Sequence, residues 1–179
     1  MRKAWALAAS LLVSSAALAA PSEQDKLFAQ LRQAATPEEA HPIEQKLDGL
    51  FKVSGSATVD LLMTRAKAAL AARDKSISRK LLDSVTKVAP NYAEGWRARA
   101  AMQAAAGDDS GAMVSLQKAV DLNPRHFEAM SDLAGMLEDY GDKPAALKLY
   151  RRALALDPQW TDAIRREKVL AKELEGQGI

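Results

Sequence analysis

The chain has 179 residues, with 25 Lys and Arg, 23 Asp and Glu, and no cysteine. The length suits one or two domains, and the lack of cysteine excludes disulfides, thiol catalysis and a cysteine-linked lipid anchor. An alanine-rich composition with few aromatic residues favours helices over a β-rich core and leaves few large side chains to line a deep ligand pocket.

The first nineteen residues are typical of a secretory signal peptide. Arg2 and Lys3 precede an apolar run over 4–16, and Ala17-Leu18-Ala19 supplies the small-residue cleavage site. A transmembrane anchor is the alternative interpretation. However, the run is short, rich in Ala and Ser, and followed by Pro21, so it would span a bilayer poorly. We therefore expect residues 1–19 to be removed by cleavage after Ala19.

Removal of this segment changes the charge of the protein. The segment holds two basic and no acidic residues, so 25 − 2 = 23 basic residues remain against 23 acidic ones. A protein with a net charge near zero has no large positive field to attract nucleic acid. The sequence thus predicts a soluble, exported protein, most simply periplasmic, with no lipid anchor and no transmembrane segment after cleavage.

Residues 20–58 predict a pair of helices. Leu27, Phe28 and Leu31 lie on one side of a helix over 23–35. Thr36-Pro37 begins a second helix that continues to about 51, with a kink or restart at Pro42. Because 25–58 is 34 residues long, the pair can also be interpreted as a degenerate form of the repeat that follows.

An internal repeat governs the rest of the chain. Pro90, Pro124 and Pro158 are separated by 34 residues each, and similar segments precede them. Counting back from these prolines gives three units, 59–92, 93–126 and 127–160.

Each unit predicts two helices joined by a tight turn. In the third unit Met130, Leu133, Ala134 and Leu137 follow the i, i+3, i+4, i+7 spacing of one apolar helical face. A long coiled coil is excluded because the turns interrupt any heptad. Residues 161–179 predict a capping helix and a short tail, in which Ile164 and Leu170 face inward and charged side chains cover the outer face.

Polar residues recur where the helices begin. An Asp stands at the same place in all three turns, where its carboxylate can accept the free N–H groups of the second helix. These residues are Asp74, Asp108 and Asp142. Asn91 and Glu94 also have the spacing of a capping box before the first helix of the second unit.

The three units resemble the tetratricopeptide repeat over about three fifths of the chain that follows the signal. The small residues that the family needs at its eighth, twentieth and twenty-seventh places are all present: Ala66, Ala100 and Ala134; Ser78, Ala112 and Ala146; Val85, Ala119 and Ala153. The resemblance implies an all-α fold, an α-solenoid of about three helix-turn-helix units between the N-terminal helical pair and the capping helix. Several phrases, among them 54–60 and 175–179, are also similar to small exported members of the family from alphaproteobacteria, a group with no defined activity.

The resemblance further implies a partner-binding groove along the first helix of each unit. The places that face this groove in the family hold side chains of mixed charge, and they define the candidate site: Asp60, Met63, Lys67, Leu70, Glu94, Arg97, Ala101, Glu128, Ser131, Glu138 and Asp139. Met63 and Lys67 stand where some members carry the Lys and Asn that hold a terminal carboxylate, so that clamp is absent. An extended or helical segment with both charged and apolar residues fits the groove better. Each of these residues can equally belong to a solvated face.

Two arginines depart from the family pattern. Arg65 and Arg99 occupy the seventh place, where Leu133 in the third unit is the usual packed leucine. A buried guanidinium needs a partner or a route to water. The alternatives are stems that lie over the neighbouring alanines, an ion pair with a carboxylate such as Asp60 or Glu94, or an anion site. The structural ion pair is favoured over the anion site.

The sequence offers no reaction chemistry. The two histidines, His41 and His126, are 85 residues apart and lack metal-ligand spacing, and His126 is interpreted as a polar residue of a turn. No phosphate loop, nucleotide fingerprint or nucleophile elbow occurs. We expect neither an enzyme nor a cofactor, but an adaptor for a protein or peptide in envelope assembly or protein maturation. The alternative is a structural subunit packed permanently into a larger envelope complex.

Overall fold

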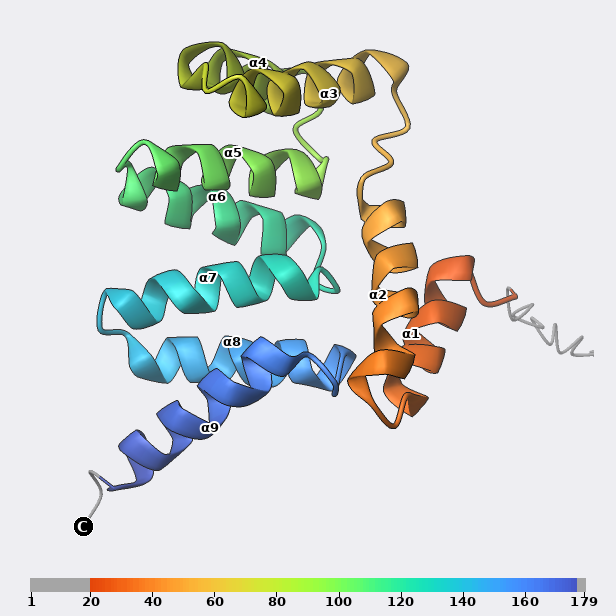
Figure 1. Cartoon of the computed structure of the whole chain (residues 1–179), viewed down its shortest axis with the longest axis vertical. Helices are drawn as coiled ribbons and strands as arrows, with labels where there is room; N and C mark the ends of the chain where they lie inside the picture. The colour runs from red at the N-terminus through yellow and green to blue at the C-terminus, as the bar shows by residue number, and fades with distance from the viewer. Residues whose placement is uncertain (1–19, 177–179) are drawn as a thin grey trace, which may run out of the picture.

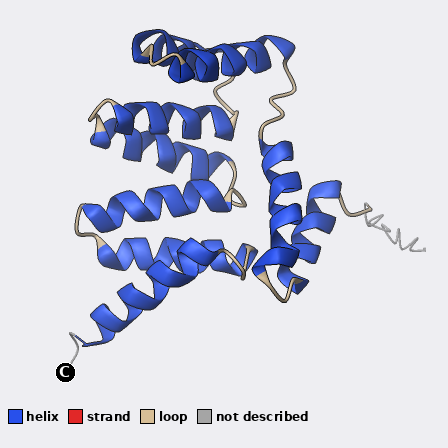
Figure 2. Ribbon diagram, viewed as in Figure 1, coloured by secondary structure: helices blue, strands red, loops and turns tan. Residues whose placement is uncertain are grey.

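The structure, a computed structural model, describes residues 20–176, and the expected signal peptide lies outside them. The described residues form nine helices joined by short loops, and no strand occurs among them (Figure 2). The helices are α1 (Glu23–Gln33), α2 (Pro37–Phe51), α3 (Ala57–Ala71), α4 (Lys75–Val88), α5 (Ala93–Ala105), α6 (Asp109–Leu122), α7 (Phe127–Asp139), α8 (Lys143–Leu156) and α9 (Thr161–Gly176).

Helices α3 to α9 form one continuous stack. The pairs α3–α4, α5–α6 and α7–α8 follow one another, and α9 packs on α8 at the end (Figure 1). Small residues allow the helices to approach closely, since Ala66, Ala100 and Ala134 are all buried. The all-α solenoid predicted from the repeat is therefore confirmed.

The turn inside each pair is held by the predicted aspartates. Asp74 accepts a hydrogen bond from the Ile77 N–H at 2.9 Å, and Asp108 and Asp142 do the same at the starts of α6 and α8. Each carboxylate thus satisfies a backbone donor that has no partner inside its helix. The capping role of the three residues is confirmed.

The capping box predicted from Asn91 and Glu94 is wrong. Tyr92 precedes the first turn of α5, and no side chain caps that helix. The Glu94 side chain is buried instead, with its Oε2 atom 3.2 Å from His126 Nε2. A buried partner holds the carboxylate away from the helix start.

The N-terminal pair begins with regular caps. Ser22 and Asp25 form a reciprocal capping box on α1, and Thr36 caps α2, which has Pro37 in its first turn. Pro42 lies within α2 but does not end the helix, which continues to Phe51. The expected pair of helices is present.

The pair does not continue the stack. Figure 1 shows α2 running along one edge of the stack, roughly across the direction of the stacked helices. The rings of Phe28 and Phe51 contact that of Phe127 with centroids 6.3 and 6.0 Å apart, and Gln159 Nε2 donates to the Ala34 carbonyl at 3.1 Å. The pair thus packs against the turns around α7 and α8. A degenerate repeat that continued the stack would lie on α3 instead.

The described helices carry no membrane-spanning candidate: none of them combines the length and the apolar character that crossing a bilayer requires.

Candidate binding groove

Two cavities lie side by side along the first helices of the repeats. The first has a volume of about 230 Å³ and lies between α3, α4 and α5. Met63, Leu70 and Met102 give it apolar walls, and Lys67 stands at its exposed side. The buried Ser78 hydroxyl, which has no hydrogen-bond partner among the described atoms, also lines it.

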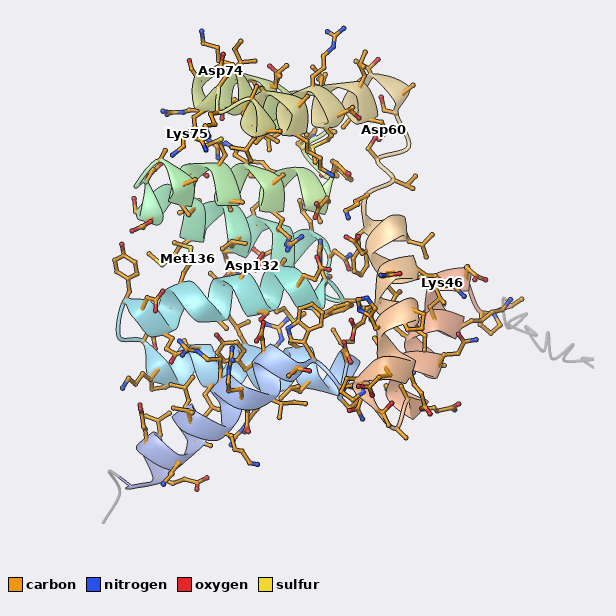
Figure 3. All side chains as sticks on the ribbon, viewed as in Figure 1. Lys46, Asp60, Asp74, Lys75, Asp132 and Met136 are labelled. Atoms are coloured by element: carbon orange, nitrogen blue, oxygen red, sulfur yellow. The ribbon has the colours of Figure 1, made fainter. Side chains whose placement is uncertain are left out.

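The second cavity, of about 380 Å³, lies between α5, α6 and α7. Leu116 and Met136 form its apolar part, and it shares Arg97, Ala101 and Asp132 with the first cavity. Figure 3 labels Asp132 and Met136 on α7. Because three residues belong to both cavities, the two form one surface, which we call the groove.

Arg97 sits at the junction of the two cavities and is held by three carboxylates. Its Nη1 atom lies 2.7 Å from Glu128 Oε2 and 3.5 Å from Glu94 Oε2, while its Nε donates to Asp132 Oδ2 at 2.7 Å. One positive charge therefore faces three negative ones. The groove was expected to be of mixed charge, and around Arg97 its acidic residues outnumber the basic one.

The pKa values reflect this network. Burial alone would raise the pKa of Glu94, but the hydrogen bond with His126 and the charge of Arg97 outweigh it, so the pKa is lowered. Burial would lower the pKa of Arg97, yet the charges of Asp132, Glu128 and Glu94 raise it. Burial also raises the pKa of Glu128 despite the nearby Arg97. The guanidinium is thus fixed in its charged form.

His126 connects the groove to the N-terminal pair. Its side chain is fully buried, and its ring lies over that of Phe51 with centroids 4.4 Å apart. The interpretation of His126 as an ordinary polar residue of a turn is therefore wrong. It is buried because α2 covers the turn in which it lies.

The structure brings six of the eleven candidate groove residues together around the first cavity: Met63, Lys67, Leu70, Glu94, Arg97 and Ala101. Glu128 joins them through its contact with Arg97.

The remaining four candidates lie elsewhere. Asp60 is at the start of α3, where it accepts a hydrogen bond from Ser54 Oγ at 2.6 Å. Glu138 pairs with Arg166 of α9 at 2.9 Å. Ser131 is half-buried and Asp139 is exposed.

The two unusual arginines have different surroundings. Arg99 donates from Nε to Asp83 Oδ1 at 2.8 Å and from Nη1 to Ser115 Oγ at 3.0 Å. Arg99 thus forms an ion pair, and its partner is Asp83 rather than Asp60 or Glu94, the two carboxylates given as examples. Arg65 is exposed and forms no ion pair within the described part of the chain.

Several residues that line the groove were not predicted from the sequence. Asp132 is the second carboxylate of α7 on Arg97, and Ser78 and Leu82 of α4 close the first cavity from behind. The sequence does contain a signal for Asp132. Glu128 and Asp132 are both acidic and stand at the second and sixth places of the third unit, opposite Arg97 at the fifth place of the second unit. The contribution of α4 has no such signal, because that helix belongs to the layer behind the groove.

Another cavity, of about 590 Å³, lies outside the groove between the start of α2 and the start of α9. Glu38, His41 and Glu44 line it on one side, and Trp160 lines it on the other. Asp157 is fully buried nearby, and burial together with the charge of Glu44 raises its pKa to about 7. Among residues 20–176, no three His, Asp or Glu side chains are grouped so that they could hold a metal ion.

The chain was compared with family models, with curated proteins and with solved structures. No family model matches the chain. A TPR repeat-containing protein of Rhizobium etli is 35% identical over 78 residues, which are 44% of this chain and 38% of that protein. The chain thus covers well under half of the length of that relative.

Solved structures share the fold at low sequence identity. The Sgt2 TPR domain from Aspergillus fumigatus has a TM-score of 0.60 at 21% identity, covering 67% of this chain and 81% of that one. MamA has a TM-score of 0.60 at 18% identity, covering 89% and 87%. The first TPR of Spaghetti (RPAP3), solved with an HSP90 peptide, has a TM-score of 0.60 at 17% identity, covering 65% and 93%.

The stacked helix pairs and the groove along their first helices define an α-solenoid repeat protein. The chain shares its fold with these tetratricopeptide-repeat domains, and its 34-residue period and the small residues at its helix contacts match the repeat that the sequence predicts.

Proposed function

We propose that the chain is an exported adaptor that binds a segment of another protein in the groove. The observation that carries this proposal is the cavity between α3, α4 and α5, which is lined by six residues at groove-facing places of the repeat. The cavity is apolar at its walls and charged at its rim. This is expected of a surface that takes up one side chain of a bound segment and orients the residues on either side of it.

The chemistry of the groove favours a particular kind of segment. Met63, Leu70 and Met102 offer a socket for one apolar side chain, and methionine side chains adapt to varied shapes. Next to it, three carboxylates face the single charge of Arg97. A segment with an apolar anchor and a basic residue a short distance away complements both features.

The comparisons support a binding role without naming a partner. One structure of similar fold holds an HSP90 peptide, and another is described as a TPR domain in complex with Hsp70. In those proteins this fold accommodates segments of other proteins. Export rests on residues 1–19, whose sequence is typical of a signal peptide.

Filling the socket tests the proposal. Ala101 is exposed and lines both cavities, so Ala101→Leu occupies groove space without disturbing a buried contact. We expect this variant to lose its partner when the chain is isolated by crosslinking from the envelope fraction of its native cell. Arg97→Glu is a poor probe because it would leave Glu94, Glu128 and Asp132 without their counter-charge.

Ala155→Leu is the matched control, because Ala155 is an exposed alanine of α8 that lines neither groove cavity. Retention of the same partner by both variants, with unchanged circular dichroism, would refute binding in the groove. The mass of the protein recovered from cells tests export separately, since an intact N-terminus in the periplasmic fraction contradicts cleavage after Ala19.

A further inference from the structure

The first helix of the stack has an outer face that no part of the described chain covers. Leu61, Arg65 and Ala68 follow one another on this face at i, i+4 and i+7, and all three are exposed, Leu61 by 50%. We call these three residues the end face. A large apolar side chain and a cation thus stand side by side in solvent.

The repeat shows what the end face is built to contact. The same places in α5 hold Gly95, Arg99 and Met102, and each of them contacts the preceding helix pair. A Cβ atom added to Gly95 would lie 2.7 Å from Val85 Cγ1, Arg99 bonds Asp83 at 2.8 Å, and Met102 is buried in the same apolar cluster as Val85. These places are therefore the seat for a helix in the position of α4.

The N-terminal pair does not fill that seat. It docks on the turns around α7 and α8, as the ring contacts of Phe28 and Phe51 with Phe127 show. Leu61 gives a physical reason, because the equivalent residues Gly95 and Ala129 are small and buried. A Leu here prevents a helix with a large side chain at that point from approaching to the usual distance.

Charge indicates which kind of helix fits. Residues 59–92 carry seven basic and three acidic residues, whereas 93–126 carry four of each and 127–160 carry four basic and six acidic. The positive end of the molecule is thus the end with the open face. Arg65 lacks the carboxylate that its counterpart Arg99 finds in Asp83.

We infer that the end face binds a helix of a partner protein, one that presents a carboxylate to Arg65 and a small residue to Leu61. An acidic helix complements the excess of basic residues in 59–92. A second copy of this chain is disfavoured as the occupant, because it would bring two such positive ends together. The surface is distinct from the groove, since none of the three residues lines either groove cavity.

The chain's own junction supplies the probe. A peptide of the α4 sequence, 75–88, carries the carboxylate of Asp83 in the required place. Val85→Ala makes room for Leu61, glutamates at the four basic positions make the peptide acidic, and a hydrocarbon staple keeps it helical. Fluorescence anisotropy then measures its binding to the whole chain.

Charge exchange gives the decisive comparison. Arg65→Glu should raise the Kd of this peptide by about tenfold or more, and Arg65→Gln by less, because a partly desolvated ion pair is replaced by repulsion or by a neutral contact. Asp83→Lys in the peptide should restore binding to the Arg65→Glu chain. Arg152→Glu, an equal charge change at an exposed site on α8, should leave the Kd almost unchanged, as should Ala101→Leu in the groove.

Three results would overturn the inference. Equal affinities for the Arg65→Glu and Arg152→Glu chains would show that only net charge matters. A dimer that Leu61→Asp dissociates in sedimentation would make a second copy the occupant. Arg65-dependent binding to phosphatidylglycerol vesicles in the absence of peptide binding would make the face a membrane contact.

Discussion

One backbone position distinguishes the turns of the three repeats. Gly107 and Gly141 have φ angles of 80° and 88° in the turns of the second and third repeats, and Arg73 has a φ of 61° at the same place in the first. A residue with a Cβ atom is strained in this left-handed region, while glycine is not. The first turn therefore carries a local cost that the other two avoid.

Replacing Arg73 by glycine should stabilise the protein. Arg73 is exposed, so Arg73→Gly removes the strain and is expected to raise the free energy of unfolding by about 0.5–1 kcal/mol. Urea unfolding measures the change. The mirror variant Gly107→Arg should lower stability by a similar amount, since a Cβ at Gly107 meets no atom within 4 Å and only the backbone term changes. A shift of the same sign in both variants would contradict this account.

Asp157 should make the stability depend on pH. It is fully buried, and its Oδ1 atom accepts from the Gln159 N–H at 3.0 Å, as Asn123 Oδ1 does from Arg125 in the previous repeat. Its pKa is raised to about 7, first by burial and then by Glu44. In the unfolded chain an Asp has a pKa of about 4. Between these values the folded state binds the proton that the unfolded state has lost.

The free energy of unfolding should therefore fall as pH rises from about 4 to about 7 and then level off. Asp157→Asn keeps the Oδ1 acceptor and removes the charge, so it should be more stable than the parent at pH 8 by on the order of 2 kcal/mol, with little difference at pH 4. Denaturant unfolding at both pH values tests this. If the free energies of unfolding of parent and variant differed by the same amount at pH 4 and at pH 8, Asp157 would not titrate between these pH values.

At the level of elements, the N-terminal pair is held by aromatic contacts and a few polar ones. Phe51 is central, because its ring contacts those of Phe28, Phe127 and His126. Asp25 binds Arg125 at 2.5 Å, and the Arg125 guanidinium lies 4.0 Å above the Phe28 ring. The pair is thus a separate element joined to the stack by one patch.

Phe51→Ala should release this element. Truncation of a buried phenylalanine costs about 3–5 kcal/mol, and here the loss falls on the docking of α1 and α2. Hydrogen exchange should become faster in both helices while α3 and α4 keep their protection. Leu50→Ala is the control, because Leu50 is the residue next to Phe51 and its side chain is 39% exposed. Uniform acceleration along the whole chain would mean that the pair is not an independent element.

The elements predicted from sequence were those set by local rules. Helical spacing, turn glycines and capping aspartates act within a few residues, so the helix pairs and the caps at Asp74, Asp108 and Asp142 could be predicted. The docking of α1 and α2 could not, because Asp25 and Arg125 are 100 residues apart and share no repeat position. The burial of His126 and the displacement of Glu94 from a cap follow from that docking.

At the scale of the whole molecule, stability is distributed along the stack. Within the stack, the main contacts of each helix pair are with the pairs next to it, so a change at one end should stay near that end. The C-terminal end is closed by α9, which buries Ala163 and Leu170 and forms ion pairs with α8 such as Glu167 with Arg151 at 2.8 Å. Ile164 was expected to face inward with Leu170, but that prediction is wrong, because its side chain is 37% exposed.

Leu170→Ala should therefore weaken one end of the stack only. The loss of a fully buried leucine side chain costs about 2–5 kcal/mol, and hydrogen exchange should quicken in α8 and α9 but not in α3 and α4. Val169→Ala, at a neighbouring site 45% exposed, should change little. Loss of protection throughout the stack would show that it unfolds as a single cooperative unit.

The position of α1 and α2 has a consequence for the order of folding. A stack of repeats can form from any point, because its contacts are close in sequence. The N-terminal pair instead needs the carbonyl of Ala34 to meet Gln159, 125 residues later. These helices emerge before the repeats during synthesis but meet their binding surface only when the third repeat has formed. Their docking should therefore be the slow step, and their apolar residues stay open to other proteins until then.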